Sequence, residues 1–87
     1  MMESTDIIFY PLMTESASLM VEKDNKLIFM VNLNAGKPDV KKAVEELYEV
    51  KVDKVTLLIT PQGQKKAFVK LKPEFKASDV AIKLGIL

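Results

Sequence analysis

The sequence lacks cysteine, histidine and arginine, three residue types that carry much of protein chemistry. Among its 87 residues there is no Cys and no His, and all 13 basic side chains are Lys. Disulfides, thiol nucleophiles and thiolate metal sites are therefore excluded, as are sites built on the commonest general base and metal ligand. Without a guanidinium fork, bidentate clamping of phosphate or carboxylate is excluded too. We expect no enzyme, no cofactor and no metal.

Long hydrophobic runs are also absent. No apolar stretch approaches the roughly 20 residues that span a bilayer. The first six residues are acidic and lack the basic segment of a signal peptide. A 48% apolar, 29% charged composition argues against disorder. These features predict one compact domain over residues 1–87, located in the cytoplasm.

Charge is distributed unevenly along the chain, although the net charge is only +1. Residues 1–22 contain four carboxylates and no lysine, for a charge of −4. Residues 51–76 contain seven lysines against two carboxylates, for a charge of +5. The split predicts an acidic end and a basic surface suited to an anionic partner. Chance unevenness on a solvated surface is the alternative.

Hydrophobic periodicity predicts the order β-α-β-α-β-β followed by a short helix. Strands are expected at 7–10, 27–33, 52–60 and 66–72, with a turn at 61–64 that makes the last two a hairpin. The strand at 27–33 is apolar on both alternating faces, which is typical of a strand covered on both sides. The fold class is therefore α+β, with a mainly antiparallel four-stranded sheet packed by helices on one or both faces.

Helices are expected after a Thr14 cap, over 37–49, and from Ser78 or Asp79 to a stop at Gly85. The middle helix has a predicted buried stripe at helical spacing. It consists of Val40, Ala43, Val44 and Leu47.

Lys37, Lys41 and Lys42 crowd the first half of the middle helix. This is the positive end of the helix dipole, where cations are disfavoured. The cluster is explained if an anion such as phosphate binds there. A solvated charged face is the alternative.

Basic and aromatic side chains alternate along the last strand. One face carries Lys66, Phe68, Lys70 and Lys72; Lys65 lies beside the turn, and Lys54 belongs to the same basic segment. Lysines on phosphates and an aromatic ring on a base or sugar would suit nucleic-acid binding. Alternatively, the lysines protect an edge strand from aggregation and Phe68 packs beneath a helix.

Thr14 and Glu15 stand where a loop meets a helix. Thr14 is a helix cap by residue type, and Glu15 is a carboxylate in the positive first turn. Their structural role is the simpler interpretation. A functional one is an exposed carboxylate held at a fixed position.

Several segments together resemble one family. They are 10–17 (YPLMTESA), 25–29 (NKLIF), 36–52 (GKPDVKKAVEELYEVKV), 60–71 (TPQGQKKAFVKL) and 81–85 (AIKLG). The first is similar to the family's opening signature, the third to its best-marked helix, and the fourth to its final hairpin. The family is the universal large-subunit ribosomal protein of the exit-tunnel rim, protein twenty-three. The short hairpin and the ending resemble its archaeal branch.

The resemblance implies a structural constituent of the large ribosomal subunit that binds ribosomal RNA near the nascent-chain exit. It also implies neighbouring ribosomal proteins as partners, and docking of the signal recognition particle and the translocon without membrane insertion. Factor docking maps onto Glu15 in the Thr14-Glu15 motif. RNA contacts map onto the lysine clusters and their aromatic neighbour: Lys37, Lys41, Lys42, Lys54, Lys65, Lys66, Phe68 and Lys70. The chain departs from the family at Ser16 and Gln62, where lysine is usual.

A second hypothesis requires no RNA. A small protein-interaction module could bind a partner through its acidic first helix or through a sheet edge. Failure to bind ribosomal RNA at any salt concentration would favour this alternative.

Overall fold

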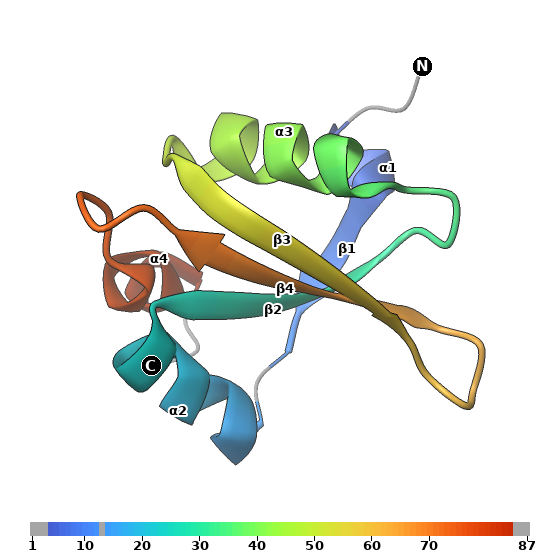
Figure 1. Ribbon diagram of the computed structural model, residues 1–87, viewed down its shortest axis with the longest axis horizontal. Helices are drawn as coiled ribbons and strands as arrows, with labels where there is room; N and C mark the ends of the chain where they lie inside the picture. The colour runs from blue at the N-terminus through green and yellow to red at the C-terminus, as the bar shows by residue number, and fades with distance from the viewer. Residues whose placement is uncertain (1–3, 13, 85–87) are drawn as a thin grey trace.

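Four strands form one antiparallel sheet in the computed structural model, which describes residues 4–12 and 14–84. The strands are β1 (Ile8–Pro11), β2 (Lys26–Val31), β3 (Val52–Ile59) and β4 (Lys65–Leu71). Their order across the sheet is β1-β2-β4-β3, and every neighbouring pair is antiparallel (Figure 1). The predicted α+β fold, its antiparallel sheet and the final hairpin are confirmed.

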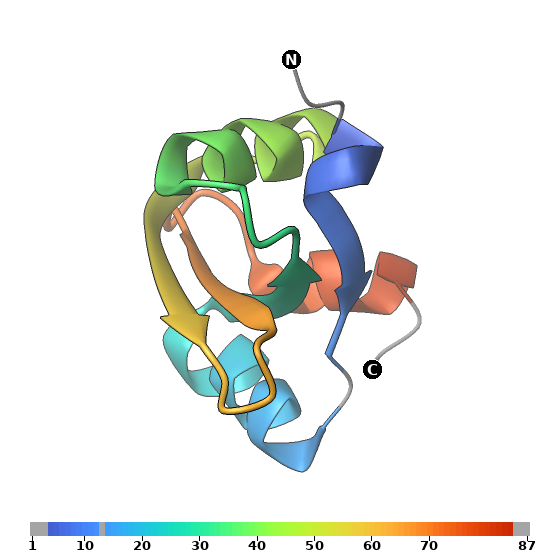
Figure 2. The ribbon, with the colours of Figure 1, turned by 90° about the vertical axis from the view of Figure 1, so that its right-hand side faces the viewer.

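Helices connect the first three strands and close the chain. They are α1 (Ser4–Ile7), α2 (Glu15–Asp24), α3 (Lys37–Tyr48) and α4 (Ala77–Leu84). Figures 1 and 2 show α1 and α3 side by side at one end of the molecule and α2 at the other. The one-turn helix α1 was not expected, because Ile7 had been assigned to the first strand. None of the helices in the described ranges is long and apolar enough to cross a membrane.

One face of the sheet, here called the inner face, carries the hydrophobic core. Its side chains come from β2 and β4 in alternation: Leu27, Phe29, Val31, Ala67, Val69 and Leu71. All four helices contribute to the same cluster, for example through Val44 of α3 and Val80 of α4. The opposite face is here called the outer face. On β2, Ile28 and Met30 point outward and are buried as well, so this strand is covered on both sides as predicted.

The buried stripe of α3 differs from the prediction at one position. Val40, Ala43 and Val44 are buried, whereas Leu47 is 41% exposed. Tyr48 occupies the core position instead, since Val40, Val44 and Tyr48 follow a four-residue spacing on one helix face. Its ring stacks on Phe29 with centroids 5.7 Å apart. Burial raises the pKa of the Tyr48 phenol above its ordinary value.

The last helix begins at Ala77, ahead of the predicted caps Ser78 and Asp79. The reason is a distant side chain. Asn25, at a left-handed φ of 55°, ends α2 and accepts a hydrogen bond of 2.6 Å from the Ala77 N–H through its Oδ1. Its Nδ2 donates to the carbonyls of Leu71 and Phe75. The predicted stop at Gly85 lies outside the described residues.

The hairpin between β3 and β4 turns where predicted. The Thr60 N–H donates to the Gln64 carbonyl at 2.7 Å, and the Gly63 N–H donates to the Thr60 carbonyl at 2.9 Å. Gly63 has a φ of 80°, a conformation that residues with a side chain rarely adopt. Glycine is therefore required by the shape of this turn.

Candidate nucleic-acid interface

Three lysines face one another across the outer face of the sheet. In the strand register Lys70 of β4 lies opposite Lys54 of β3 on one side and Lys26 of β2 on the other. Residues directly opposite in an antiparallel sheet have Cβ atoms roughly 4.5–5.5 Å apart. The three lysines, called the lysine row from here on, are thus a continuous line of positive charge over three strands.

The lysine row is unfavourable for the isolated protein. Like charges directly opposite each other destabilise a sheet, and Lys70 has such a neighbour on both sides. Lys54 and Lys70 are exposed, which leaves their ammonium groups accessible to a partner. A polyanion lying across the strands would remove the repulsion and gain three charge contacts. The geometry therefore fits a phosphate backbone.

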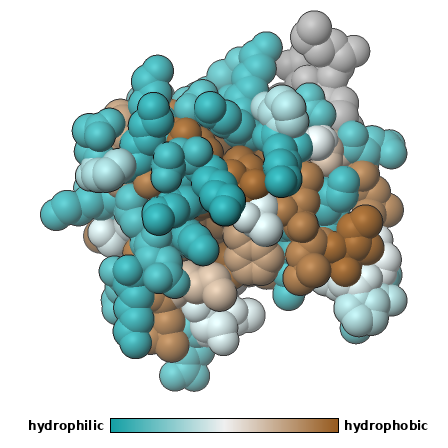
Figure 3. Space-filling view, in the orientation of Figure 1, coloured by the Kyte–Doolittle hydropathy of each residue, from teal (hydrophilic) through white to brown (hydrophobic). Residues whose placement is uncertain are grey.

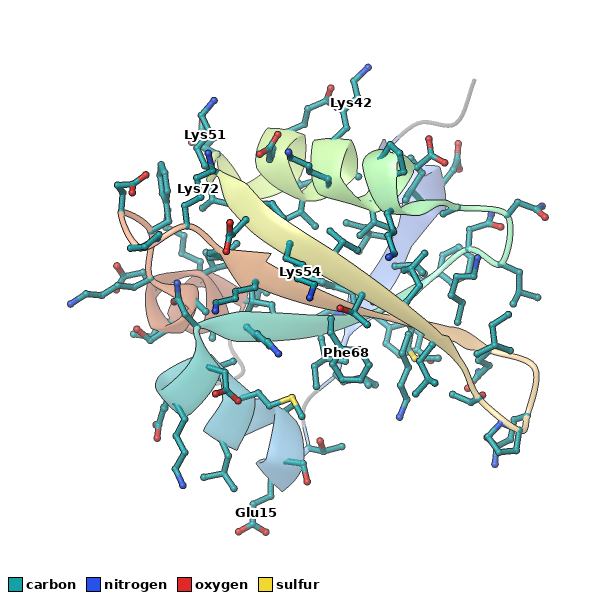
Figure 4. The ribbon with its side chains drawn as sticks, in the orientation of Figure 1. Glu15, Lys42, Lys51, Lys54, Phe68 and Lys72 are labelled. Atoms are coloured by element: carbon teal, nitrogen blue, oxygen red, sulfur yellow. The ribbon has the colours of Figure 1, made fainter. Side chains whose placement is uncertain are left out.

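An aromatic ring lies beside the lysine row. Phe68 is one pair further along β4, opposite Thr56 of β3 and Ile28 of β2, and is partly exposed. Phe68 points to the outer face, because Ala67 and Val69 occupy the inner face. Figure 4 shows Lys54 and Phe68 near the centre of the sheet. Lysines and an accessible ring are thus brought together as predicted.

The two remaining lysines of β4 have different positions. Lys66 lies on the outer face between Leu58 and Met30 and is partly buried. Lys65 lies on the other side, where its Nζ donates a 2.9 Å hydrogen bond to the carbonyl of Ala35. The structure therefore separates Lys65 from the other lysines of the predicted site.

Two lysines that the sequence did not assign to the site, Lys26 and Lys51, lie next to it. Lys26 completes the row, and it was missed because the predicted strand began one residue later. Lys51 and Lys72 are neighbours at the same end of the hairpin, where the Lys72 N–H donates to the Lys51 carbonyl at 3.0 Å (Figure 4). Both side chains are exposed. Lys72 was expected on the face of Lys70 and lies just past the end of β4, whereas the available signal for Lys51 was its place in the basic segment 51–76.

The lysines of α3 lie on the helix side of the sheet, away from the lysine row. Lys37, Lys41 and Lys42 are all exposed. Figure 4 shows Lys42 pointing away from the sheet. The Asp39 carboxylate accepts a 2.9 Å hydrogen bond from the Gly36 N–H at the start of the helix. The Asp39 carboxylate therefore already places a negative charge at the positive end of the helix dipole. This weakens the prediction that an external phosphate binds there.

Thr14 caps α2 as predicted. Its Oγ1 accepts a 3.1 Å hydrogen bond from the Ala17 N–H, and Glu15 is the first residue of the helix. Both residues are exposed, and Figure 4 shows Glu15 at the tip of α2, pointing away from the sheet. Thr14 thus has a structural role as the helix cap, whereas Glu15 presents its carboxylate to solvent.

Comparison with known proteins identifies the family. A family model described as ribosomal protein L23 matches residues 6–84. The chain is 46% identical over 85 residues to the large ribosomal subunit protein uL23 of Methanococcus aeolicus. That alignment covers 98% of this chain and 99% of the relative. The chain therefore belongs to the ribosomal protein L23 family, in its archaeal type, and is a structural constituent of the large subunit of cytoplasmic ribosomes rather than an enzyme.

Proposed function

We propose that this protein binds large-subunit ribosomal RNA near the nascent-chain exit tunnel, with the lysine row on the RNA backbone. The observation that carries the proposal is the register that places Lys70 directly between Lys26 and Lys54. Such an arrangement costs stability in the free protein and gains it only against an anion. Because the chain belongs to a large-subunit ribosomal protein family, large-subunit ribosomal RNA is the polyanion that we expect it to bind.

Lysine contacts of this kind position the protein and carry little base information. The ammonium group is a point charge that tolerates many phosphate geometries. Phe68 adds a ring on which an unpaired base or a sugar can rest. The exposed lysines of α3, namely Lys37, Lys41 and Lys42, offer a second contact on the other side of the molecule. Recognition is therefore by the shape and backbone of the RNA.

Salt dependence tests the phosphate contacts. Binding of the purified chain to protein-free large-subunit RNA is measured by filter retention between about 50 and 200 mM salt. Three lysine–phosphate contacts predict that affinity falls about 20- to 40-fold over this range through counterion release. A fall of less than about threefold would show that the lysine row does not lie on phosphates.

We also propose that Glu15 contributes to a docking site for the signal recognition particle and the translocon. Its support is an exposed carboxylate held by the capped start of α2. Ribosomes carrying Glu15→Gln should bind the particle more weakly, whereas Glu22→Gln, an exposed carboxylate later in the same helix, is the matched control. Equal binding by both variants and the parent would remove Glu15 from the docking site.

A further inference from the structure

Large hydrophobic side chains are exposed at one end of the sheet, at the turn of the β3–β4 hairpin and the start of β1. Their exposed fractions are Phe9 57%, Tyr10 49%, Leu33 53%, Leu58 52% and Ile59 61%. These five residues are called the apolar end. Figure 3 shows hydrophobic side chains gathered on the right of the view, the side where the hairpin turns, while hydrophilic ones predominate at the upper left. Exposed apolar groups that cluster mark an interaction site more often than scattered ones do.

A groove of about 400 Å³ runs through the apolar end. Its walls come from three separate segments: Phe9 and Tyr10 on β1, Leu33 in the loop after β2, and Gly63 in the hairpin turn. A groove of this size holds one or two large side chains. Anchors in such pockets supply much of the binding energy of protein interfaces.

A β-bulge turns two consecutive aromatic residues of β1 outward. The register between β1 and β2 shifts between Ile8 and Tyr10, so that Phe9 is the extra residue. Regular alternation would bury one of two successive side chains, whereas both Phe9 and Tyr10 are exposed here. Bulges commonly redirect a side chain toward a functional surface.

The scarcity of charged side chains at the apolar end indicates which kind of partner can bind there. The uncharged residues at this end are Phe9 and Tyr10, residues 30–34 and the hairpin residues 58–64. Among the residues that line the groove, Lys65 alone is charged, and its ammonium is bonded to the Ala35 carbonyl; Asp6 lies close by, since its carbonyl accepts a hydrogen bond from the Asn32 amide. An RNA backbone would meet mostly carbon here, and a basic peptide would be disfavoured because the charged side chain that lines the groove is a lysine. The surface fits an apolar partner without basic residues.

The extent of the groove argues against a second copy of the chain. Stable protein interfaces use about 20–30 residues on each side. Ten residues line this groove. An opening of this size is matched by a short segment rather than by a second globular surface.

We propose that the apolar end is a docking site for a short apolar segment of another protein, one that lacks basic residues and seats a large aliphatic or aromatic side chain between Phe9 and the hairpin turn. This proposal is independent of the RNA contacts of the lysine row, because the two surfaces share no residue.

Photocrosslinking in assembled large subunits tests the proposal. The photoreactive p-benzoylphenylalanine replaces Leu33 in one sample and Ile82 in the other, where Ile82 is 62% exposed on α4 and distant from the groove residues in sequence and element. The expected result is a nuclease-resistant adduct at position 33, absent at position 82, whose mapped peptide is apolar and lacks Lys and Arg. An adduct to RNA, an adduct to a second copy, or no adduct at position 33 would overturn the proposal.

A synthetic peptide of the mapped sequence then tests the groove directly. Leu33→Asp should weaken its binding to the purified chain at least about tenfold, because an anion would be desolvated in an apolar groove. Ile82→Asp introduces the same charge on α4 and should leave binding unchanged. Both substitutions are at exposed positions, and equal thermal midpoints would confirm that both variants fold. Equal loss of binding in both, or in neither, would contradict the assignment.

Discussion

The two ends of the β3–β4 hairpin carry opposite kinds of surface on the same two strands. At the end where β3 begins and β4 finishes, Lys54 and Lys70 form part of the lysine row, with Lys51 and Lys72 next to them. At the turn end, Leu58 and Ile59 are more than half exposed, and residues 55–64 carry no charge. One hairpin therefore joins a surface suited to phosphate with one suited to apolar side chains.

The difference shows that a net charge of +1 conceals two specialised regions. On the inner face, Val55, Val69 and Ala67 of the hairpin are buried in the shared core. Along the outer face, in contrast, the β3 side chain changes from Lys54 at one end to Leu58 at the other. The strands can thus change their partner chemistry along their length without a change of fold.

Charge reversal in the lysine row should produce the largest effect. Lys54→Glu combined with Lys70→Glu should reduce affinity for large-subunit RNA about a hundredfold, because two contacts become repulsive. Filter binding at low salt measures the loss, and a weaker salt dependence should accompany it.

The matched control is the pair Lys37→Glu and Lys41→Glu, which changes the net charge equally on the helix side of the sheet. We expect a loss of less than about tenfold from this pair. Equal losses from the two pairs would move the principal RNA contact to α3.

Gly63→Ala should change the turn end without affecting RNA binding. A Cβ at this position would meet no atom within 4 Å, so the cost arises from the φ of 80° alone. We expect a loss of about 1 kcal/mol in the free energy of unfolding, and a thermal midpoint roughly 4–8 °C lower. Gly36→Ala, at a φ of −95°, should cost less. If the Gly63 variant loses RNA affinity, the two ends of the hairpin are not separate surfaces, and both contribute to RNA binding.

Lys70→Gln should give a smaller effect of opposite sign. It removes the repulsion of Lys70 with both Lys26 and Lys54, and should raise the free energy of unfolding by about 0.5 kcal/mol at low salt. Thermal melts at low salt and at about 0.5 M salt should show the gain shrinking as the charges are screened. Lys83→Gln, in the last turn of α4, removes a favourable dipole interaction and should not stabilise. A lower thermal midpoint for the Lys70 variant than for the parent would show that the three lysines of the lysine row do not destabilise the sheet by repulsion.

Local patterns were sufficient to predict the four strands, the three longer helices and the alternation of β4. Each depends on spacing within one segment, such as the cap at Thr14 or the turn around Gly63. Ile7 was wrongly assigned to the first strand. Four residues are too few for the hydrophobic pattern to distinguish the period of a helix from that of a strand. The approximate location of the basic site was also predictable, since most of its lysines fall within residues 51–76.

Features that depend on distant pairing were not predictable. Lys26 joins the site only through its register opposite Lys70, and no pattern around Lys26 shows that partner. The hydrogen bond that holds the Lys65 ammonium goes to a carbonyl 30 positions away in sequence. The convergence of three uncharged segments at one end likewise requires the order of the strands.

The side chain of Asn25 has a consequence for the order in which the chain assembles. It holds the start of α4 through the Ala77 N–H, a partner 52 positions later in the sequence, and is itself fixed between α2 and β2. During synthesis from the N-terminus, this acceptor is made long before the residue that donates to it. The final helix therefore docks onto a template prepared by the first third of the chain, and completion of the fold waits for the last residues to be released.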